Sequence, residues 1–192
     1  MKFSEAKKFI LQKLKKELPR HLSYHSVEHV VDVVNAAKAI GKSEGVNGED
    51  MKLLLTAALF HDSGFLKGPK EHEQESCNIA RNYLPQYGYT PEQIEKICGM
   101  IMATRIPQTP HTHLEQILAD ADLDYLGRED FWIIGNKLFD ELSVYGMIQD
   151  ENEWNKLQIT FLEKHHYFTE TAIHSRKAKK DEYLAAIKSK IH

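Results

Sequence analysis

The segment LLLTAALFHDSG, residues 53–64, is the stretch of sequence that decides the fold. Its first eight residues are apolar on nearly every face, so a helix built from them has to be surrounded by other helices. We expect this helix to begin near Glu49 and to be stopped by Gly64. The sequence therefore predicts a central buried helix that ends at His61 and Asp62.

Helical periodicity extends over the rest of the chain, and no window shows the sustained alternation typical of a strand. Prolines, glycines and an N-cap serine bound the predicted helices. These helices cover about residues 3–18, 26–41, 49–61, 71–84, 91–104, 113–125, 131–142, 154–161 and 169–189. We therefore predict an all-α fold, a compact bundle of many helices.

The length of 192 residues suits one domain. The sequence contains no repeat, no low-complexity tract and no linker long enough to divide the chain, so we predict a single domain over residues 1–192. The oligomeric state is left open, and a homo-oligomer is allowed. The basic run Arg176–Lys180 is interpreted as a solvated helix face, because Asp181 and Glu182 follow it.

The charge and the apolar segments exclude several classes of protein. The net charge of −3 argues against a general nucleic-acid binder, which normally carries a basic excess. No stretch approaches the roughly 18–20 apolar residues that cross a membrane, and the N-terminus lacks the uninterrupted apolar run of a signal peptide. Cys77 and Cys98 lie far apart and read as reduced thiols. We therefore expect a cytoplasmic protein without membrane association.

Four polar residues stand in apolar surroundings. His61 and Asp62 end the most buried of the predicted helices, where a charged carboxylate is costly to desolvate unless it is paired or bound to a metal. His29 lies on a predicted helix among valines, and Asp122 interrupts another apolar helix. Two imidazoles and two carboxylates suit Mn²⁺, Fe²⁺, Co²⁺, Zn²⁺ or, less well, Mg²⁺. The four residues are therefore candidate metal ligands, and the alternative is a buried ion-pair network without metal.

Asp122 has two acidic neighbours, Asp120 and Asp124. Acids at i, i+2 and i+4 cannot all face one direction on a helix, so the three cannot share one function. Asp120 and Asp124 are expected to be supporting hydrogen-bond acceptors or surface acids. A calcium-binding loop is excluded, because Tyr125 and Phe131 stand where that loop needs Gly and Glu.

The order and the surroundings of these residues resemble the HD-domain superfamily of metal-dependent phosphohydrolases. The similar segments are YHSVEHVVDVV around His29, AALFHDSGF around the His61-Asp62 pair, and ILADADLDYLG around Asp122. The resemblance implies that these four residues hold a divalent metal ion.

The resemblance covers about residues 20–130, which would form the metal-binding core, and the helices over about 131–192 would be a C-terminal extension. Within the core the sequence departs from two groups of that family. Binuclear members carry further histidines; His72 could be one, but Thr104 and its neighbours stand where another is expected. The acidic pair of the guanosine-polyphosphate hydrolases is missing, with Phe65 near that position. A complete second metal site is therefore not expected.

The function implied is a metal-dependent phosphohydrolase, a phosphomonoesterase or phosphodiesterase, acting on a nucleotide or another small phosphoester. The ion would lower the pKa of a bound water, and the resulting hydroxide would attack phosphorus. Asp62 is expected to orient or deprotonate the water, and His72 or His25 to protonate the leaving group. Lys67 and Arg105 are candidates for phosphate contact, and Arg105 is expected to face the pocket.

Two other functions remain open at this point. One is a signalling module that binds a metal ion or nucleotide without turnover. The other is a di-iron oxygenase, since some proteins with the HD fold activate oxygen. That second function needs two irons, so the incomplete second site counts against it.

Overall fold

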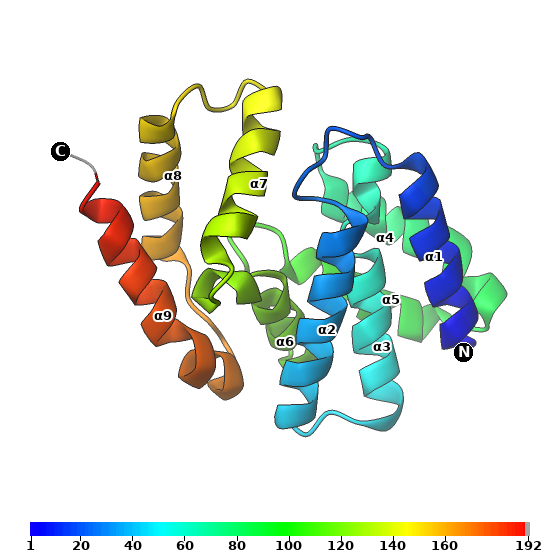
Figure 1. The fold of residues 1–192 in the computed structure, drawn as a ribbon. Coiled ribbons are helices and arrows are strands. Elements are labelled where there is room, and N and C mark those ends of the chain that lie inside the picture. The colour runs from blue at the N-terminus through cyan, green and yellow to red at the C-terminus, as the bar shows by residue number, and fades with distance from the viewer. Residues whose placement is uncertain (191–192) are drawn as a thin grey trace.

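The computed structural model describes residues 1–190, and this part of the chain contains nine α-helices, three short 3₁₀ helices and no strand (Figure 1). The all-α prediction is confirmed. The α-helices are α1 (Phe3–Glu17), α2 (Val27–Ser43), α3 (Gly48–Phe60), α4 (His72–Tyr83), α5 (Pro91–Ala103), α6 (His113–Asp122), α7 (Phe131–Val144), α8 (Glu151–Lys164) and α9 (Glu170–Lys188). The 3₁₀ helices are η1 (Ser63–Leu66), η2 (Leu84–Tyr87) and η3 (Asp124–Gly127).

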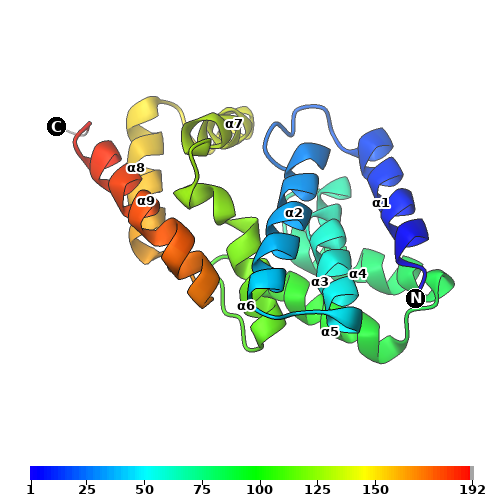
Figure 2. The ribbon, with the colours of Figure 1, turned by 60° about the horizontal axis from the view of Figure 1, so that its bottom comes forward.

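Helix α3 is the centre of the first half of the molecule. Leu53, Leu54, Ala57 and Ala58 on this helix are completely buried. Helices α1, α2, α4, α5 and α6 all contact it, and the two ribbon views show it enclosed among them (Figures 1 and 2). An apolar helix without a polar face needs this arrangement, because any side left in water would expose apolar surface.

The remaining helices, α7, α8 and α9, lie beside this bundle, on the far side of α6 from α1 (Figures 1 and 2). They share a second hydrophobic cluster with η3. Its buried members are Tyr24, Leu123, Tyr125, Leu126, Phe131, Leu162, Tyr183 and Ile187. The cluster contains residues from before and after position 130. The single domain over residues 1–192 stays a prediction.

The boundaries of helices α6 and α8 differ most from the sequence prediction. Helix α8 begins at Glu151 rather than near residue 154, because the Asp150 carboxylate caps it by accepting a hydrogen bond from the Glu153 amide at 2.8 Å. Helix α6 ends at Asp122 rather than near residue 125, because the backbone turns at Leu123 before η3 begins. This turn separates Asp122 from the acid that follows it.

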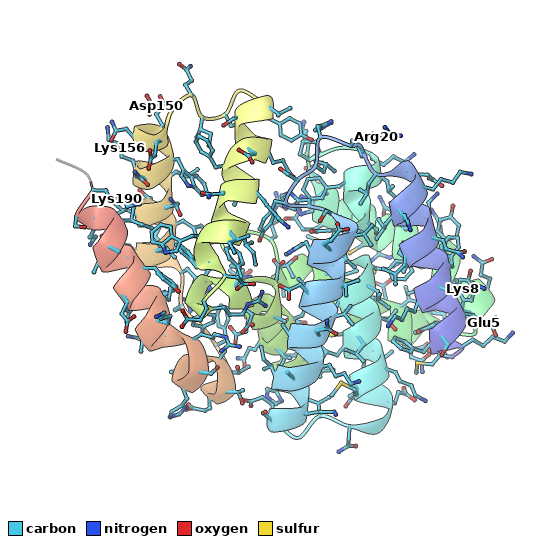
Figure 3. The ribbon with its side chains drawn as sticks, in the orientation of Figure 1. Glu5, Lys8, Arg20, Asp150, Lys156 and Lys190 are labelled. Atoms are coloured by element: carbon cyan, nitrogen blue, oxygen red, sulfur yellow. The ribbon has the colours of Figure 1, made fainter. Side chains whose placement is uncertain are left out.

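Charged side chains cover the outer faces of the helices. Figure 3 labels six of them, all exposed: Glu5, Lys8, Arg20, Asp150, Lys156 and Lys190. None of the described helices combines the length and the apolar character that a membrane crossing requires.

The contact between η3 and α9 is close because Gly127 has no side chain. An ideal Cβ at Gly127 would lie 2.7 Å from the Cα atom of Arg176 and still closer to its carbonyl oxygen. We expect Gly127→Ala to lower the free energy of unfolding by about 1–3 kcal/mol, because α9 has to move away from η3. Urea unfolding monitored by circular dichroism measures this change.

Gly135→Ala is the matched control. The nearest neighbours of an ideal Cβ at this position in α7 are 3.8 and 3.9 Å away, which are ordinary contacts. This variant should be more stable than the wild type by about 0.5–1 kcal/mol, since glycine weakens a helix interior. Equal stability of the wild type and the Gly127→Ala protein would contradict the close approach of α9.

Candidate metal centre

Three helices bring the predicted ligands together. His29 lies in the first turn of α2, where the Ser26 hydroxyl caps the helix by accepting a hydrogen bond from the His29 amide. His61 is the C-cap residue of α3, with Asp62 directly after it, and Asp122 is the last residue of α6. Since α2 and α6 both pack on α3, the ends of these helices meet.

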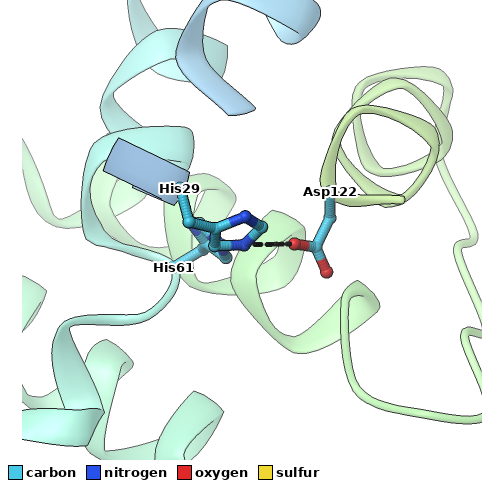
Figure 4. Close-up of side chains that lie close together, drawn as sticks. All are labelled: His29, His61 and Asp122. Carbon is cyan, nitrogen blue, oxygen red and sulfur yellow. Dashed lines mark hydrogen bonds and ion pairs between the residues drawn. The ribbon is translucent and has the colours of Figure 1, made fainter. Parts of the chain in front are cut away.

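The nitrogen and oxygen atoms of these side chains converge on one point. The His29 Nε2 and His61 Nε2 atoms lie 3.2 and 3.3 Å from Asp122 Oδ1, and 3.4 Å from each other. Figure 4 shows the two imidazole rings facing the Asp122 carboxylate. The Asp62 Oδ2 atom lies 3.4 Å from His29 Nε2 and 3.2 Å from His61 Nε2. The geometry therefore brings together all four residues chosen from the sequence.

These side chains are nearly removed from solvent. Their exposed fractions are 7% for His29, 0% for His61, 7% for Asp62 and 15% for Asp122. Burial alone would raise the pKa of both carboxyls, but the neighbouring histidines lower the pKa of Asp122 to about 2 and hold that of Asp62 well below its ordinary value. Burial disfavours the charged form of His61 as well, yet the two carboxylates raise its pKa well above the ordinary value. Two charged carboxylates here thus require a positive charge between them.

A divalent metal ion fits these requirements. The Asp62 Oδ2 atom is buried, and it has no hydrogen-bond partner among the residues that the structure describes. The His61 Nδ1 atom lies 2.8 Å from the Ala58 carbonyl oxygen, so Nδ1 carries the proton and donates it, and Nε2 is left with its lone pair toward the carboxylates. Two imidazoles and two carboxylates form a donor set that transition metals prefer. A bound cation would therefore supply the charge that a proton on His61 otherwise supplies.

His25 and His72 stand next to this group. The Phe65 ring stacks on His25, with ring centres 3.9 Å apart, and its other neighbour is His72 at 4.3 Å. The His72 Nε2 atom lies 3.6 Å from Asp62 Oδ1, the carboxylate oxygen that is further from the two metal-site histidines. Both histidines line the cavity beside the candidate metal centre.

The cavity has a volume of about 220 Å³. One end is formed by His25, Asp62, His72, Glu73 and Asp122. The remaining walls come from the loop after α5 and from η3, α7 and α8: Thr104, Ile106, Leu123, Tyr125, Leu126, Phe131, Gly135, Leu138, Leu142, Trp154, Leu157, Gln158, Phe161 and Leu162, with Tyr24 from the loop before α2. The candidate metal centre therefore opens onto a cavity whose remaining walls are formed largely by α7 and α8.

Lys67 and Arg105, the two candidates for phosphate contact, do not line this cavity. Both are exposed. Arg105 lines a separate depression with Met102 and Ala103, contrary to the expected orientation. The physical reason is the turn after α5, in which Thr104 is buried and faces the cavity, so that the next side chain is directed elsewhere.

The three acids of α6 and η3 have three different partners. The Asp120 carboxylate accepts hydrogen bonds from the amides of Phe168 and Thr169, at 2.9 and 2.8 Å. Asp124 forms an ion pair with Arg176, whose Nε atom lies 2.7 Å from Asp124 Oδ1. The two acids on either side of Asp122 therefore hold the α8–α9 connection and α9 in place.

The basic run of α9 is not the solvated face that the sequence predicted. Arg176 pairs with Asp124, and Lys180 is buried, donating hydrogen bonds to the carbonyl oxygens of Leu162 and His165. Only a tertiary contact distinguishes these two residues from the exposed Lys177 between them.

Glu141 on α7 is a site residue that the sequence analysis missed. Its side chain is 1% exposed and accepts hydrogen bonds from the amides of Tyr24 and His25, at 2.9 and 3.1 Å, and from His25 Nδ1. The sequence did contain a signal for it. Glu141 follows Ile134 and Leu138 at the spacing of one helix face, so an acid stands where an apolar residue is expected. Glu141 thus fixes the orientation of the His25 ring at the edge of the cavity.

A sequence profile of the HD domain matches residues 26–124, which is more than half of the chain. The chain belongs to the HD domain family. All four candidate ligands lie within the matched segment, and α7, α8 and α9 follow it. No significant match was found among curated proteins.

Solved structures of bacterial proteins share the fold. A protein from Lactobacillus plantarum is 20% identical, with a TM-score of 0.67 over 98% of this chain and 96% of that chain. YpgQ of Bacillus subtilis, solved in complex with ADP, is 18% identical, with a TM-score of 0.67 over 100% of this chain and 97% of that one. A predicted HD superfamily hydrolase from an uncultured Thermotogales bacterium is 21% identical, with a TM-score of 0.62 over 95% and 87% of the two chains. At sequence identities this low, the structural similarity establishes the shared fold and nothing further.

The buried Glu141 carboxylate should make stability depend on pH. Burial opposes its ionisation, but the hydrogen bonds and the charge of His25 lower its pKa below the ordinary value of 4.5. We expect Glu141→Gln to lower the free energy of unfolding by about 1–3 kcal/mol at pH 7, because three hydrogen bonds lose a charged acceptor. The difference from wild type should be full above pH 4.5 and should shrink as the pH falls through the lower, folded-state pKa.

Denaturant unfolding at a series of pH values measures this difference. Asp140→Asn is the control, because it removes a neighbouring carboxylate that is exposed. Its effect should stay within about 0.5 kcal/mol at every pH. A difference for Glu141→Gln that did not change with pH would contradict a charged Glu141 in the folded protein.

Proposed function

We propose that this protein is a metal-dependent phosphohydrolase that cleaves a phosphoester of a nucleotide or of another small phosphorylated molecule. The observation that carries the proposal is the convergence of His29, His61, Asp62 and Asp122 beside a cavity that Asp62 and Asp122 line. Membership of the HD domain family supports the same reaction class.

These four residues would hold the metal ion. An ion bound there would lower the pKa of a water molecule and withdraw charge from a phosphoryl oxygen. The Asp62 carboxylate is divided between two roles, since Oδ2 faces the two metal-site imidazoles and Oδ1 faces His72. We assign to Oδ1 the orientation of the attacking water and the acceptance of its proton.

His25 and His72 are the candidates for protonating the leaving group. Both line the cavity next to the candidate metal centre, and imidazole exchanges protons near neutral pH. His25 Nδ1 donates a hydrogen bond to the Glu141 carboxylate, which leaves Nε2 for the substrate. Because Lys67 and Arg105 lie outside the cavity, we assign phosphate binding to the metal ion and these two histidines.

The nucleotide assignment has support from a related structure. YpgQ of Bacillus subtilis, which shares the fold over the whole of this chain, was solved in complex with ADP.

Within residues 1–190, His29, His61 and Asp122 form the single group of three or more metal-binding side chains with converging ligand atoms. That count favours a mononuclear hydrolase over the di-iron oxygenase.

The metal ion is tested first. Protein purified without chelators should carry a transition-metal ion, and added Mn²⁺ or Fe²⁺ should raise the melting temperature, because the ion binds the folded state alone. His61→Ala should lose both the metal content and the thermal shift. His174→Ala, which removes an exposed histidine of α9, should keep both. If the wild-type protein stays metal-free after incubation with either ion, the four residues form an ion-pair network without metal.

Hydrolysis is tested next, by phosphate release from a panel of phosphoesters with metal-loaded protein. His25→Ala and His72→Ala should retain the metal ion and lower kcat by about 100-fold or more where the residue is the general acid. Tight binding of a phosphoester without release would identify a signalling module. Two irons per chain together with oxygen consumption would identify an oxygenase.

A further inference from the structure

The cavity next to the candidate metal centre changes character along its length. The acids and histidines lie at the metal end, whereas the walls formed by α7 and α8 consist of leucines, aromatic rings, Gly135 and a single amide, Gln158. On the basis of the proposed function, we infer that the substrate carries a single phosphate group on an uncharged, largely aromatic or apolar body, and that this body occupies the space between α7 and α8.

The absence of cations in the cavity argues for a single phosphate. Across residues 1–190, no lysine or arginine lines this space, and the acids Glu73, Asp62 and Asp122 all lie at its metal end. A second or third phosphate would place further negative charge against apolar walls or against these carboxylates. An unpaired charge removed from water costs several kcal/mol or more, so we expect a monophosphate to be hydrolysed in preference to a polyphosphate.

The walls match a flat, apolar body. Phe131, Trp154 and Phe161 offer ring surfaces, and the tyrosines Tyr24 and Tyr125 line the same space nearer to the metal end. Aromatic side chains bind planar groups through offset stacking and edge contacts as well as by burial. A volume of about 220 Å³ leaves room for a body of one or two rings.

Gly135 determines how much of this space is open. It lines the cavity from α7, and an ideal Cβ there would have the Gln158 side-chain oxygen and Trp154 as its nearest neighbours, at 3.8 and 3.9 Å. A larger side chain at this position would therefore occupy the cavity between α7 and α8 at a distance from the metal ligands.

The first experiment compares phosphate release from matched substrates. Phenyl phosphate and 2-naphthyl phosphate provide aromatic bodies, and glucose 6-phosphate provides a polar one. AMP, ADP and ATP hold the body constant while the number of phosphates changes. We expect kcat/KM to be about ten-fold or more higher for the aromatic esters than for glucose 6-phosphate, and higher for AMP than for ATP by a similar factor.

A preference for ATP or for glucose 6-phosphate would overturn the inference and leave the proposed function intact. Release from none of the six by metal-loaded protein would overturn the inference. The proposed function would fail as well only if no phosphoester of the wider panel were hydrolysed.

The second experiment fills the cavity. Gly135→Leu should lower kcat/KM for 2-naphthyl phosphate about ten-fold or more relative to phenyl phosphate, because the larger body loses its space. Asn136→Leu places the same side chain on an exposed position of α7 and should leave the ratio unchanged. Retained metal content and retained activity on phenyl phosphate establish that the Gly135→Leu protein is folded.

Leu138→Ala enlarges the same cavity and tests the inference independently of Gly135→Leu. It should shift the ratio toward the larger ester. Equal changes for both esters in both cavity variants would place the substrate body elsewhere and overturn the inference.

Discussion

A carboxylate lies buried at the end of the most apolar helix, and the arrangement of the neighbouring helices follows from it. Asp62 comes directly after α3, where its side chain is only 7% exposed, and one of its oxygens has no hydrogen-bond partner among the described residues. Such a group is stable only with positive charge close by. The first turn of α2 and the last turn of α6 supply the other donors around that point. The position of these two helices against α3 is therefore set by electrostatics as well as by apolar packing.

The C-terminal helices are part of the same site. Glu141 reaches back to the backbone and side chain of His25, and Asp120 and Asp124 connect the end of α6 to the segment around Phe168 and to Arg176. These polar contacts join residues that are far apart in the chain. The acids next to Asp122 thus have structural partners, while Asp122 alone among the three faces the two histidines.

The sequence predicted the helices well because their signals are local: apolar spacing, capping residues, prolines and glycines lie within each segment. The four candidate ligands could be chosen for a related reason, since polar residues in apolar helices need an explanation. Their binding of a metal ion stays a prediction. Glu141 and the orientation of Arg105 depend instead on contacts that no local pattern encodes. Glu141 and Tyr24, for example, are 117 residues apart. The burial of Lys180 has the same origin, because its partners are carbonyl oxygens of another helix.

The candidate ligands come from residues 29–122, whereas the largest share of the cavity wall comes from α7 and α8. Under the proposed function, the groups that break a bond are thus separate from the surfaces that select the molecule containing it. Substitutions of the leucines and aromatic residues on α7 and α8 can alter substrate selectivity without changing the candidate metal ligands. A protein organised in this way can acquire a new substrate through successive substitutions, and each intermediate sequence keeps the same candidate metal ligands.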